Sequence, residues 1–223
     1  MKVIYFDTET TGLDCRRCQI IELAMLTVID GEIEERYDRF IRVDGPLPPK
    51  ITKITGITDQ MLHEDGKSES EIAEDLKVRL TPGTVMIAHN CQFDLQFVYH
   101  LLKRHLPMEA DEIVESLDWI DTLTVLKDRR EYPHKLADAV EHYKLEKVNF
   151  HRAIDDTKAL YDVTQAMKDE RDDLAEYLNV FGYNPKYGVE EEFPFITYGP
   201  QDFNRHMVEP NDILPEKIIK KRD

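Results

Sequence analysis

Residues 2–13 read KVIYFDTETTGL, an apolar run that ends in two acids and a polar turn. Such a run is typical of a β-strand. Because side chains two positions apart on a strand face the same side, we expect Asp7 and Glu9 to point into one cleft. The turn, residues 10–12, lies at the end of this strand, where open α/β sheets bind their ligands.

The rest of the chain predicts a mixed sheet of five strands. Two further apolar runs, residues 19–29 and 33–43, flank Asp30-Gly31 and indicate an antiparallel hairpin. Residues 84–89 and 119–122 are short and apolar enough for buried strands. Helical spacing and capping residues predict helices in these segments: 52–63 in short pieces, 68–80, a helix from Phe93 to His105, 123–129, 134–143 and 154–167. Strands and helices alternate after the hairpin, so the fold class is α/β.

Composition favours one globular domain with an additional segment. The chain has 223 residues, of which 41% are hydrophobic and 33% charged, so it can bury a core. No apolar run reaches the roughly 20 residues that cross a bilayer, and acids follow the N-terminus before a signal peptide could form. We therefore expect a cytoplasmic protein that binds no membrane. Three cysteines, too few for a disulfide framework, agree with a reducing compartment.

Net charge argues against a passive nucleic-acid binder. The chain has 45 acids and 29 bases, a formal net charge of -16. A protein of this charge repels phosphate unless a local patch or bound cations intervene. If the chain handles a polyanion, some of its acids must bind metal.

Two more acidic clusters follow predicted strands or begin predicted helices. Asp94 starts a helix directly after residues 84–89, and Asp155 and Asp156 start the last helix, four and five residues after His151. Each cluster alone could be an ordinary helix start, where acids interact favourably with the helix dipole.

Taken together, the clusters resemble the three motifs of the DnaQ-like (DEDDh) 3'-5' exonucleases. The matching segments are residues 7–13 (DTETTGL), His89-Asn90 with Phe93-Asp94, and His151 with Asp156. The resemblance covers about residues 1–170, and the epsilon subunit of DNA polymerase III is a well-known member of the family. It implies a ribonuclease H-like mixed five-stranded sheet flanked by helices over residues 1–175, with an irregular extension of unknown role over residues 176–223.

The resemblance also implies a two-metal mechanism. Two Mg²⁺ or Mn²⁺ ions about 4 Å apart can activate a water and neutralise the leaving oxygen, and carboxylates suit both ions. Asp7 would contact both ions, Glu9 and Asp156 would complete one metal shell, and Asp94 would help directly or through water. His151 would take the proton from the attacking water.

Substrate contacts are implied for six further residues. Leu13, Ile57, Met61 and Phe93 would flank the terminal nucleotide, although core packing explains Ile57, Met61 and Phe93 nearly as well. Thr10 and Thr11 would meet the 3' end. The expected activity is removal of nucleoside 5'-monophosphates from single-stranded or frayed 3' ends. DNA is the expected nucleic acid, and a DNA polymerase catalytic subunit is a candidate partner in proofreading.

Other interpretations remain open. The chain could be a stand-alone DNA-repair or RNA-processing exonuclease, or a non-catalytic polymerase accessory subunit on the same fold. The opening Asp7-x-Glu9-x-Thr11 is also near the Asp-x-Asp-x-Thr of haloacid-dehalogenase phosphatases, which does not explain the third motif. Cys15 and Cys18 form a C-x-x-C without a second pair, which favours a turn over a metal or redox site. Arg16 and Arg17 between them could instead contact a phosphate backbone.

Overall fold

A seven-stranded sheet forms the centre of the computed structural model, which describes residues 1–146 and 151–201. The strand order is β3-β2-β1-β4-β5-β6-β7, with β1–β2 and β2–β3 antiparallel and all other neighbours parallel. The strands are β1 (Lys2–Thr10), β2 (Ile20–Ile29), β3 (Glu32–Phe40), β4 (Val85–Ala88), β5 (Asp118–Asp121), β6 (Val180–Tyr183) and β7 (Thr197–Pro200). The α/β class and mixed sheet are confirmed.

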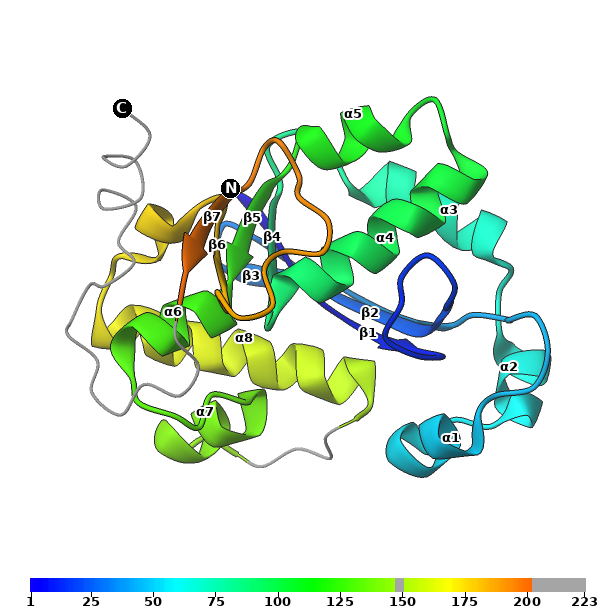
Figure 1. Ribbon diagram of the computed structural model, residues 1–223, viewed down its shortest axis with the longest axis horizontal. Helices are drawn as coiled ribbons and strands as arrows, with labels where there is room; N and C mark the ends of the chain where they lie inside the picture. The colour runs from blue at the N-terminus through cyan, green and yellow to red at the C-terminus, as the bar shows by residue number, and fades with distance from the viewer. Residues whose placement is uncertain (147–150, 202–223) are drawn as a thin grey trace.

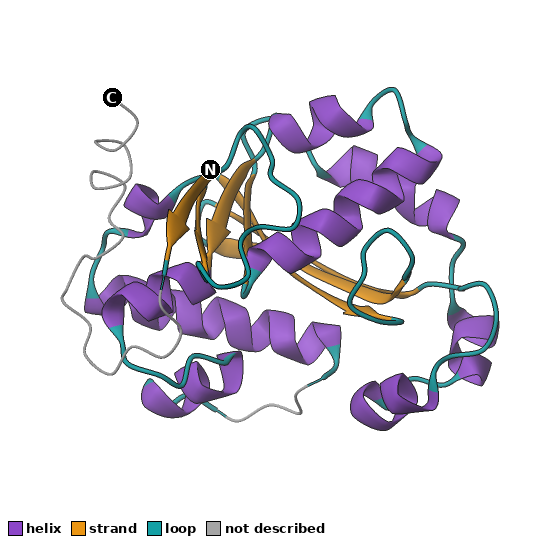
Figure 2. Cartoon of the chain, in the orientation of Figure 1, coloured by secondary structure: helices purple, strands orange, loops and turns teal. Residues whose placement is uncertain are grey.

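The helices lie on both faces of this sheet (Figures 1 and 2). They are α1 (Pro49–Thr55), α2 (Asp59–Asp65), α3 (Glu69–Arg79), α4 (Cys91–His105), α5 (Ala110–Glu115), α6 (Thr122–Arg129), α7 (Leu136–His142) and α8 (Ala153–Glu170), with a 3₁₀ turn at Leu174–Tyr177. One layer contains α3, α4 and α5, and the other contains α6, α7 and α8. The helix α5 and the 3₁₀ turn were not predicted from the sequence.

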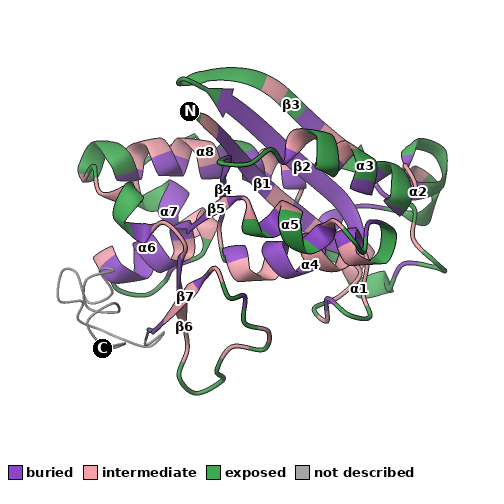
Figure 3. Ribbon diagram, turned by 90° about the horizontal axis from the view of Figure 1, so that it is seen from above, coloured by how far each residue is buried: buried purple, intermediate pink, exposed green. Residues whose placement is uncertain are grey.

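Alternation along β1 builds a separate hydrophobic core on each face. Ile4 and Phe6 pack in the core that includes α3 and α4, whereas Val3 and Tyr5 pack in the core that includes α8. The strand β2, next to the edge, is buried along nearly its whole length, while the edge strand β3 is mostly exposed (Figure 3). Odd-numbered side chains of β1 therefore face α8.

The expectation of five strands was too low by two. Both missed strands, β6 and β7, fall in the segment expected to be an irregular extension. Each has only four residues. Gly182, Gly199 and Pro200 are residue types that are depleted in strands, so the sequence pattern does not indicate a strand here. They form because β5 offers an unpaired edge, where Ile120 is the register partner of Val180. The rest of that segment, beyond residue 201, lies outside the described residues.

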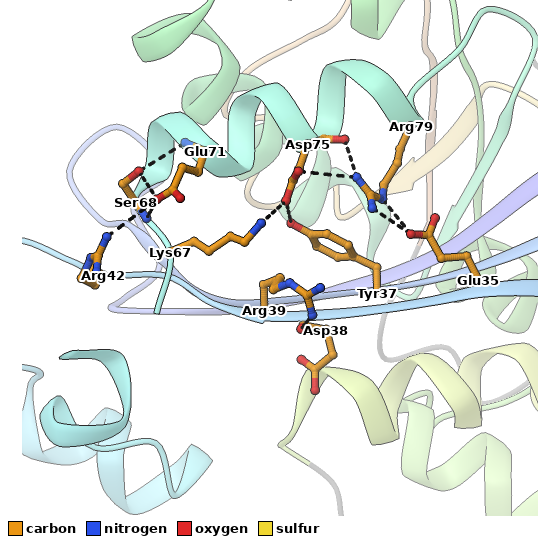
Figure 4. A network of polar contacts seen from close by, with 10 residues as sticks. All are labelled: Glu35, Tyr37, Asp38, Arg39, Arg42, Lys67, Ser68, Glu71, Asp75 and Arg79. Atoms are coloured by element: carbon orange, nitrogen blue, oxygen red, sulfur yellow. Dashed lines mark hydrogen bonds and ion pairs between the residues drawn. The ribbon is translucent and has the colours of Figure 1, made fainter. Parts of the chain in front are cut away.

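A polar network fixes α3 to the outer strand β3 (Figure 4). Asp75 on α3 accepts hydrogen bonds of 2.9 Å from both the Tyr37 hydroxyl and Lys67 Nζ. Arg79 Nη2 pairs with Glu35 at 2.8 Å, and its guanidinium lies 4.5 Å from the centre of the Tyr37 ring. Because the charged side chains of these pairs remain partly exposed to solvent, each pair contributes about 1 kcal/mol.

Within the described ranges, no helix combines the length and apolar character needed to cross a bilayer.

Candidate active site

Three carboxylates converge where the end of β1 meets the start of α8. Asp7 and Glu9 share the face of β1 that carries Val3 and Tyr5, and that face packs against α8. Asp156 lies in the first turn of α8. One carboxylate oxygen from each acid lies within 4.8 Å of the others. Period-two alternation on the strand and the position of Asp156 on the helix thus produce a single acidic cluster.

A buried ion pair holds the start of α8 against the sheet. Glu22 on β2 is fully buried and is the register partner of Glu9. Its carboxylate accepts hydrogen bonds from Arg152 Nη2 at 2.7 Å and from the backbone N–H of Ala153 at 2.9 Å. Because Arg152 and Ala153 stand at the start of α8, the pair holds against β2 the first turn of the helix, which carries Asp156.

Asp94 approaches the cluster from the opposite face of the sheet. It lies in the first turn of α4, and its Oδ1 accepts hydrogen bonds from the Thr8 backbone N–H at 3.0 Å and the Thr8 hydroxyl at 2.6 Å. Thr8 stands between the two acids of β1, so these bonds hold Asp94 against that strand. Asp94 is not one of the three acids whose oxygens lie within 4.8 Å of one another.

The turn before α4 is organised by a second buried acid. Asp121, at the end of β5, accepts hydrogen bonds from the backbone N–H groups of Asn90 at 2.8 Å and Leu123 at 3.0 Å, and from the Thr124 hydroxyl at 2.7 Å. Asn90 adopts a left-handed backbone with φ of 71°, which asparagine tolerates better than most residues. Asp121 therefore stabilises the bend from which Asp94 is presented.

His151 lies beside the cluster on the segment before α8. Its backbone N–H donates to Asp156 Oδ2 at 2.9 Å, and its side chain is exposed. Its φ of 74° is uncommon for a non-glycine residue, and such conformations usually require about 1–3 kcal/mol from the surrounding structure. The neighbouring residues 147–150 lie outside the described part of the chain.

Burial raises the pKa values of all four acids, and repulsion from neighbouring carboxylates adds to the shift. Burial raises the pKa of Asp7 well above its usual range, and the negative charges of Asp94, Asp156 and Glu9 raise it further. Burial, followed by repulsion from Asp156, raises the pKa of Glu9 to about 8. Burial also raises the pKa of Asp94 to about 7 and that of Asp156 to about 6, although hydrogen bonds from Thr8 and His151 act in the opposite direction.

The donor set fits divalent cations. Asp156 Oδ1 is buried and receives no hydrogen bond from residues 1–146 or 151–201. A buried oxygen without a donor is unfavourable unless something else compensates it. The cluster is all carboxylate, which is the ligand type preferred by Mg²⁺ and Mn²⁺. A cation would satisfy Asp156 and reduce the repulsion among its neighbours.

Thr10 and Thr11, the two residues expected to meet the 3' end, use their hydroxyls for hydrogen bonds within the turn that follows β1. The hydroxyl of Thr10 donates to the Gly12 carbonyl at 2.6 Å, and the hydroxyl of Thr11 accepts from the Gln19 backbone N–H at 3.0 Å. Leu13, in contrast, projects from the turn with 85% of its surface exposed. The threonines thus shape the turn that presents Leu13.

The other expected nucleotide contacts divide between core and surface. Ile57 is fully buried in a small cluster with Ile21, Leu47 and Leu62, so it offers no surface to a nucleotide in this structure. Met61 and Phe93 are partly exposed. Phe93 and Leu13 both line a pocket of about 280 Å³, whose wall also includes Asn90, Tyr183, Tyr187 and Tyr198.

Glu22 and Asp121 were not singled out as functional from the sequence. Glu22 had a signal, a lone acid within the apolar run of residues 20–26, because a buried charge requires a partner. Asp121 ends a short apolar strand immediately before a helix, which is a common capping position. In both cases the partners are distant in sequence, and only the fold reveals them.

Comparison with solved structures places this architecture among exonuclease folds. Escherichia coli exonuclease I, solved in complex with a dA16 oligonucleotide, matches with a TM-score of 0.71 at 19% identity, over 79% of this chain and 42% of that one. Exonuclease I from Methylocaldum szegediense matches with a TM-score of 0.68 at 25% identity, over 78% and 41%. The ribonuclease H-like fold is confirmed.

Residues 4–164 match the family model described as RNase_T, exonuclease, and the chain belongs to this family. The resemblance to DnaQ-like exonucleases is therefore confirmed. Among curated proteins, DNA polymerase III PolC-type from Latilactobacillus sakei is 33% identical over 190 residues, and the Bacillus subtilis protein is 33% identical over 179. These alignments cover 84% and 78% of this chain but only 13% and 12% of the relatives, which are far longer.

Proposed function

We propose that this chain is a metal-dependent 3'-5' exonuclease that removes nucleoside 5'-monophosphates from single-stranded or frayed DNA. The observation that carries the proposal is the convergence of Asp7, Glu9 and Asp156, with one oxygen from each within 4.8 Å of the others. Family membership supports an exonuclease, and the acidic cluster supplies what a metal-dependent one requires.

The cluster would hold two Mg²⁺ or Mn²⁺ ions. Asp7 would contact both, Glu9 and Asp156 would complete one shell, and Asp94 would assist directly or through water. When bound, such a pair lowers the pKa of a water and stabilises the leaving oxygen of a phosphodiester. The unsatisfied Oδ1 of Asp156 and the raised pKa values of Glu9 and Asp94 support this assignment.

His151 would accept the proton of the attacking water on an imidazole nitrogen. Its exposed side chain can reach a substrate, and its backbone bond to Asp156 keeps it beside the acids. A general base of this kind typically contributes about 10²- to 10⁴-fold in rate. His151→Gln should therefore lower kcat by roughly that factor while leaving metal affinity nearly unchanged.

The pocket beside the turn would receive the terminal nucleobase. Leu13 and Phe93 supply apolar surface, and three tyrosines supply rings on which a base can stack. Stacking on aromatic side chains contributes about 1–3 kcal/mol per base and tolerates every base. Arg16 and Arg17, whose side chains are 57% and 87% exposed, lie on the same loop as Leu13 and would contact the phosphate backbone.

DNA as substrate and a polymerase as partner are proposed from the relatives. The curated relatives are DNA polymerases of the PolC type, and E. coli exonuclease I was solved with a DNA oligonucleotide. We propose that the domain proofreads for a DNA polymerase catalytic subunit. A mismatched 3' end, which frays readily, would then be a better substrate than a matched one.

The test is a nuclease assay on single-stranded DNA, on duplex DNA with a matched or mismatched 3' end, and on short RNA, each with Mg²⁺. We expect 5'-mononucleotides released from the 3' end of DNA, no product in EDTA, and a loss of several orders of magnitude in Asp7→Asn. Asp155→Asn is the matched control, because Asp155 neighbours Asp156 but lies outside the converged group. Normal turnover by Asp7→Asn, or no cleavage by the parent with Mg²⁺ or with Mn²⁺ in its place, would refute the proposal.

A further inference from the structure

A second group of metal-ligating side chains lies outside the carboxylate cluster. Within the described ranges, Cys15, His100 and Glu191 each place one ligand atom within 4.8 Å of the other two. Glu191 Oε2 lies 2.8 Å from His100 Nε2 and 4.0 Å from Cys15 Sγ. The three residues come from the loop between β1 and β2, from α4, and from the segment that joins β6 to β7.

We propose that Cys15, His100 and Glu191 bind a zinc-class transition-metal ion. A thiolate, an imidazole and a carboxylate are the three ligand types that Zn²⁺ uses in proteins, whereas Mg²⁺ prefers oxygen alone. Zn–S bonds of about 2.3 Å and Zn–N or Zn–O bonds of about 2.0 Å in a tetrahedron separate the ligand atoms by roughly 3.3–3.6 Å. The distances from Glu191 Oε2 to His100 Nε2 and to Cys15 Sγ, 2.8 and 4.0 Å, differ from that separation by about half an ångström. Small side-chain rotations would correct such a difference.

The burial of the group suits a site with three protein ligands. Cys15 is 4% exposed, and the side chains of His100 and Glu191 are each 20% exposed. Solvent can therefore reach one side of the group, where a water would occupy the fourth position. On binding, the Cys15 thiol releases its proton to solvent as the metal–sulfur bond forms, and nothing is oxidised or reduced.

The neighbouring cysteine does not belong to this group. Cys18 completes the C-x-x-C in sequence, but its sulfur lies against Gly12, where an added Cβ would be only 2.7 Å away. Cys91 is fully buried in the main core. The C-x-x-C motif is therefore not the ligand pair, and Cys18 and Cys91 serve as internal controls.

Metal binding here would connect three segments that surround the pocket. Cys15 is two residues from Leu13, and Glu191 is next to Glu190, which also lines that pocket. The Gln92 side chain already donates to the Glu191 carbonyl at 2.7 Å, so the β6–β7 segment rests on α4. A bound ion would fix the pocket wall, a consequence that rests on the proposed function, whereas the metal site itself does not.

Cobalt binding tests the site without reference to nuclease activity. Metal-stripped full-length chain is titrated with Co²⁺, and the near-ultraviolet thiolate-to-cobalt charge-transfer band is recorded. We expect a band that saturates at one equivalent in the parent, in Cys18→Ser and in Asp7→Asn, and that disappears in Cys15→Ser. His100→Gln and Glu191→Gln should weaken binding at least tenfold. Circular dichroism confirms that each variant is folded.

Zinc content provides an independent readout. After Zn²⁺ loading and dialysis, the Asp7→Asn protein should retain one thiolate-dependent zinc per chain by mass spectrometry, and Cys15→Ser in that background should retain none. A parent without the charge-transfer band, a band that persists in Cys15→Ser, or an equal loss in Cys18→Ser would overturn the assignment. Because the band reports only thiolate ligation, its absence would overturn the Cys15 site but not the proposed carboxylate site.

Discussion

Replacing Glu9 with Gln should stabilise the metal-free protein. The folded chain raises the pKa of Glu9 from 4.5 to about 8, so the folded state holds a proton that the unfolded state releases. A folded state that binds more protons loses stability as the pH rises. The loss begins near pH 4.5 and is complete near pH 8. Glutamine resembles the protonated acid and carries no such penalty.

The magnitude follows from the interval between the ordinary pKa and the working pH. In the unfolded chain, pH 7 is about 2.5 units above the ordinary pKa of the Glu9 carboxyl. At 1.36 kcal/mol per unit, the upper limit of the stability lost through Glu9 is about 3 kcal/mol. Glu9 is only partly buried, so solvent screening reduces the expected gain to about 2 kcal/mol. For a chain of this length, that gain raises Tm by roughly 4–8 °C.

The assay is urea and thermal unfolding of Glu9→Gln and parent in EDTA at pH 4 and pH 7. We expect equal stability at pH 4 and the gain at pH 7. Saturating Mn²⁺ should stabilise the parent more than the variant, because the parent provides the additional ligand. Glu34→Gln, an exposed position on β3, is the control and should change little. A Glu9→Gln protein no more stable than the parent in EDTA at pH 7 would refute the electrostatic account.

Four further predictions concern the supports of the site. Glu22→Gln leaves Arg152 without its buried partner and should lower the free energy of unfolding by about 2–4 kcal/mol in urea titrations. Asp121→Ala leaves backbone donors unsatisfied and should cost about 2–3 kcal/mol, with faster amide exchange at the start of α4. Thr8→Val removes a hydroxyl that lowers the pKa of Asp94, so the carboxyl should titrate above about 7 by NMR in metal-free protein. Leu13→Ala, at an 85% exposed position, should raise KM for DNA severalfold without changing Tm; an unchanged KM would remove it from the substrate site.

The part of the fold nearest the site could be predicted from sequence because its signals are local. Asp7 and Glu9 lie on one side of β1 because strand side chains alternate, and that rule needs no tertiary information. The last helix could be placed because its apolar residues recur with helical spacing. That Asp94 and Asp156 belong with them came from the resemblance, since no periodicity links residues so far apart.

What could not be predicted depends on distant partners. The strands β6 and β7 are short and contain glycine or proline, and they form by pairing with an edge formed earlier in the chain. In the sequence, Glu22 is only a lone acid in an apolar run. Its partners, Arg152 and Ala153, are far along the chain and are identified only by the fold. The C-x-x-C of Cys15 and Cys18 was interpreted as a turn, and nothing in the sequence indicated that the fold would bring Cys15 to Glu191.

The most direct test of the carboxylate site is anomalous diffraction from crystals soaked in Mn²⁺ with a nucleoside 5'-monophosphate. We predict a manganese peak within bonding distance of oxygen atoms from Asp7, Glu9 and Asp156, with a second peak that shares Asp7. Well-ordered carboxylates with no manganese between them at saturating concentration would contradict the account.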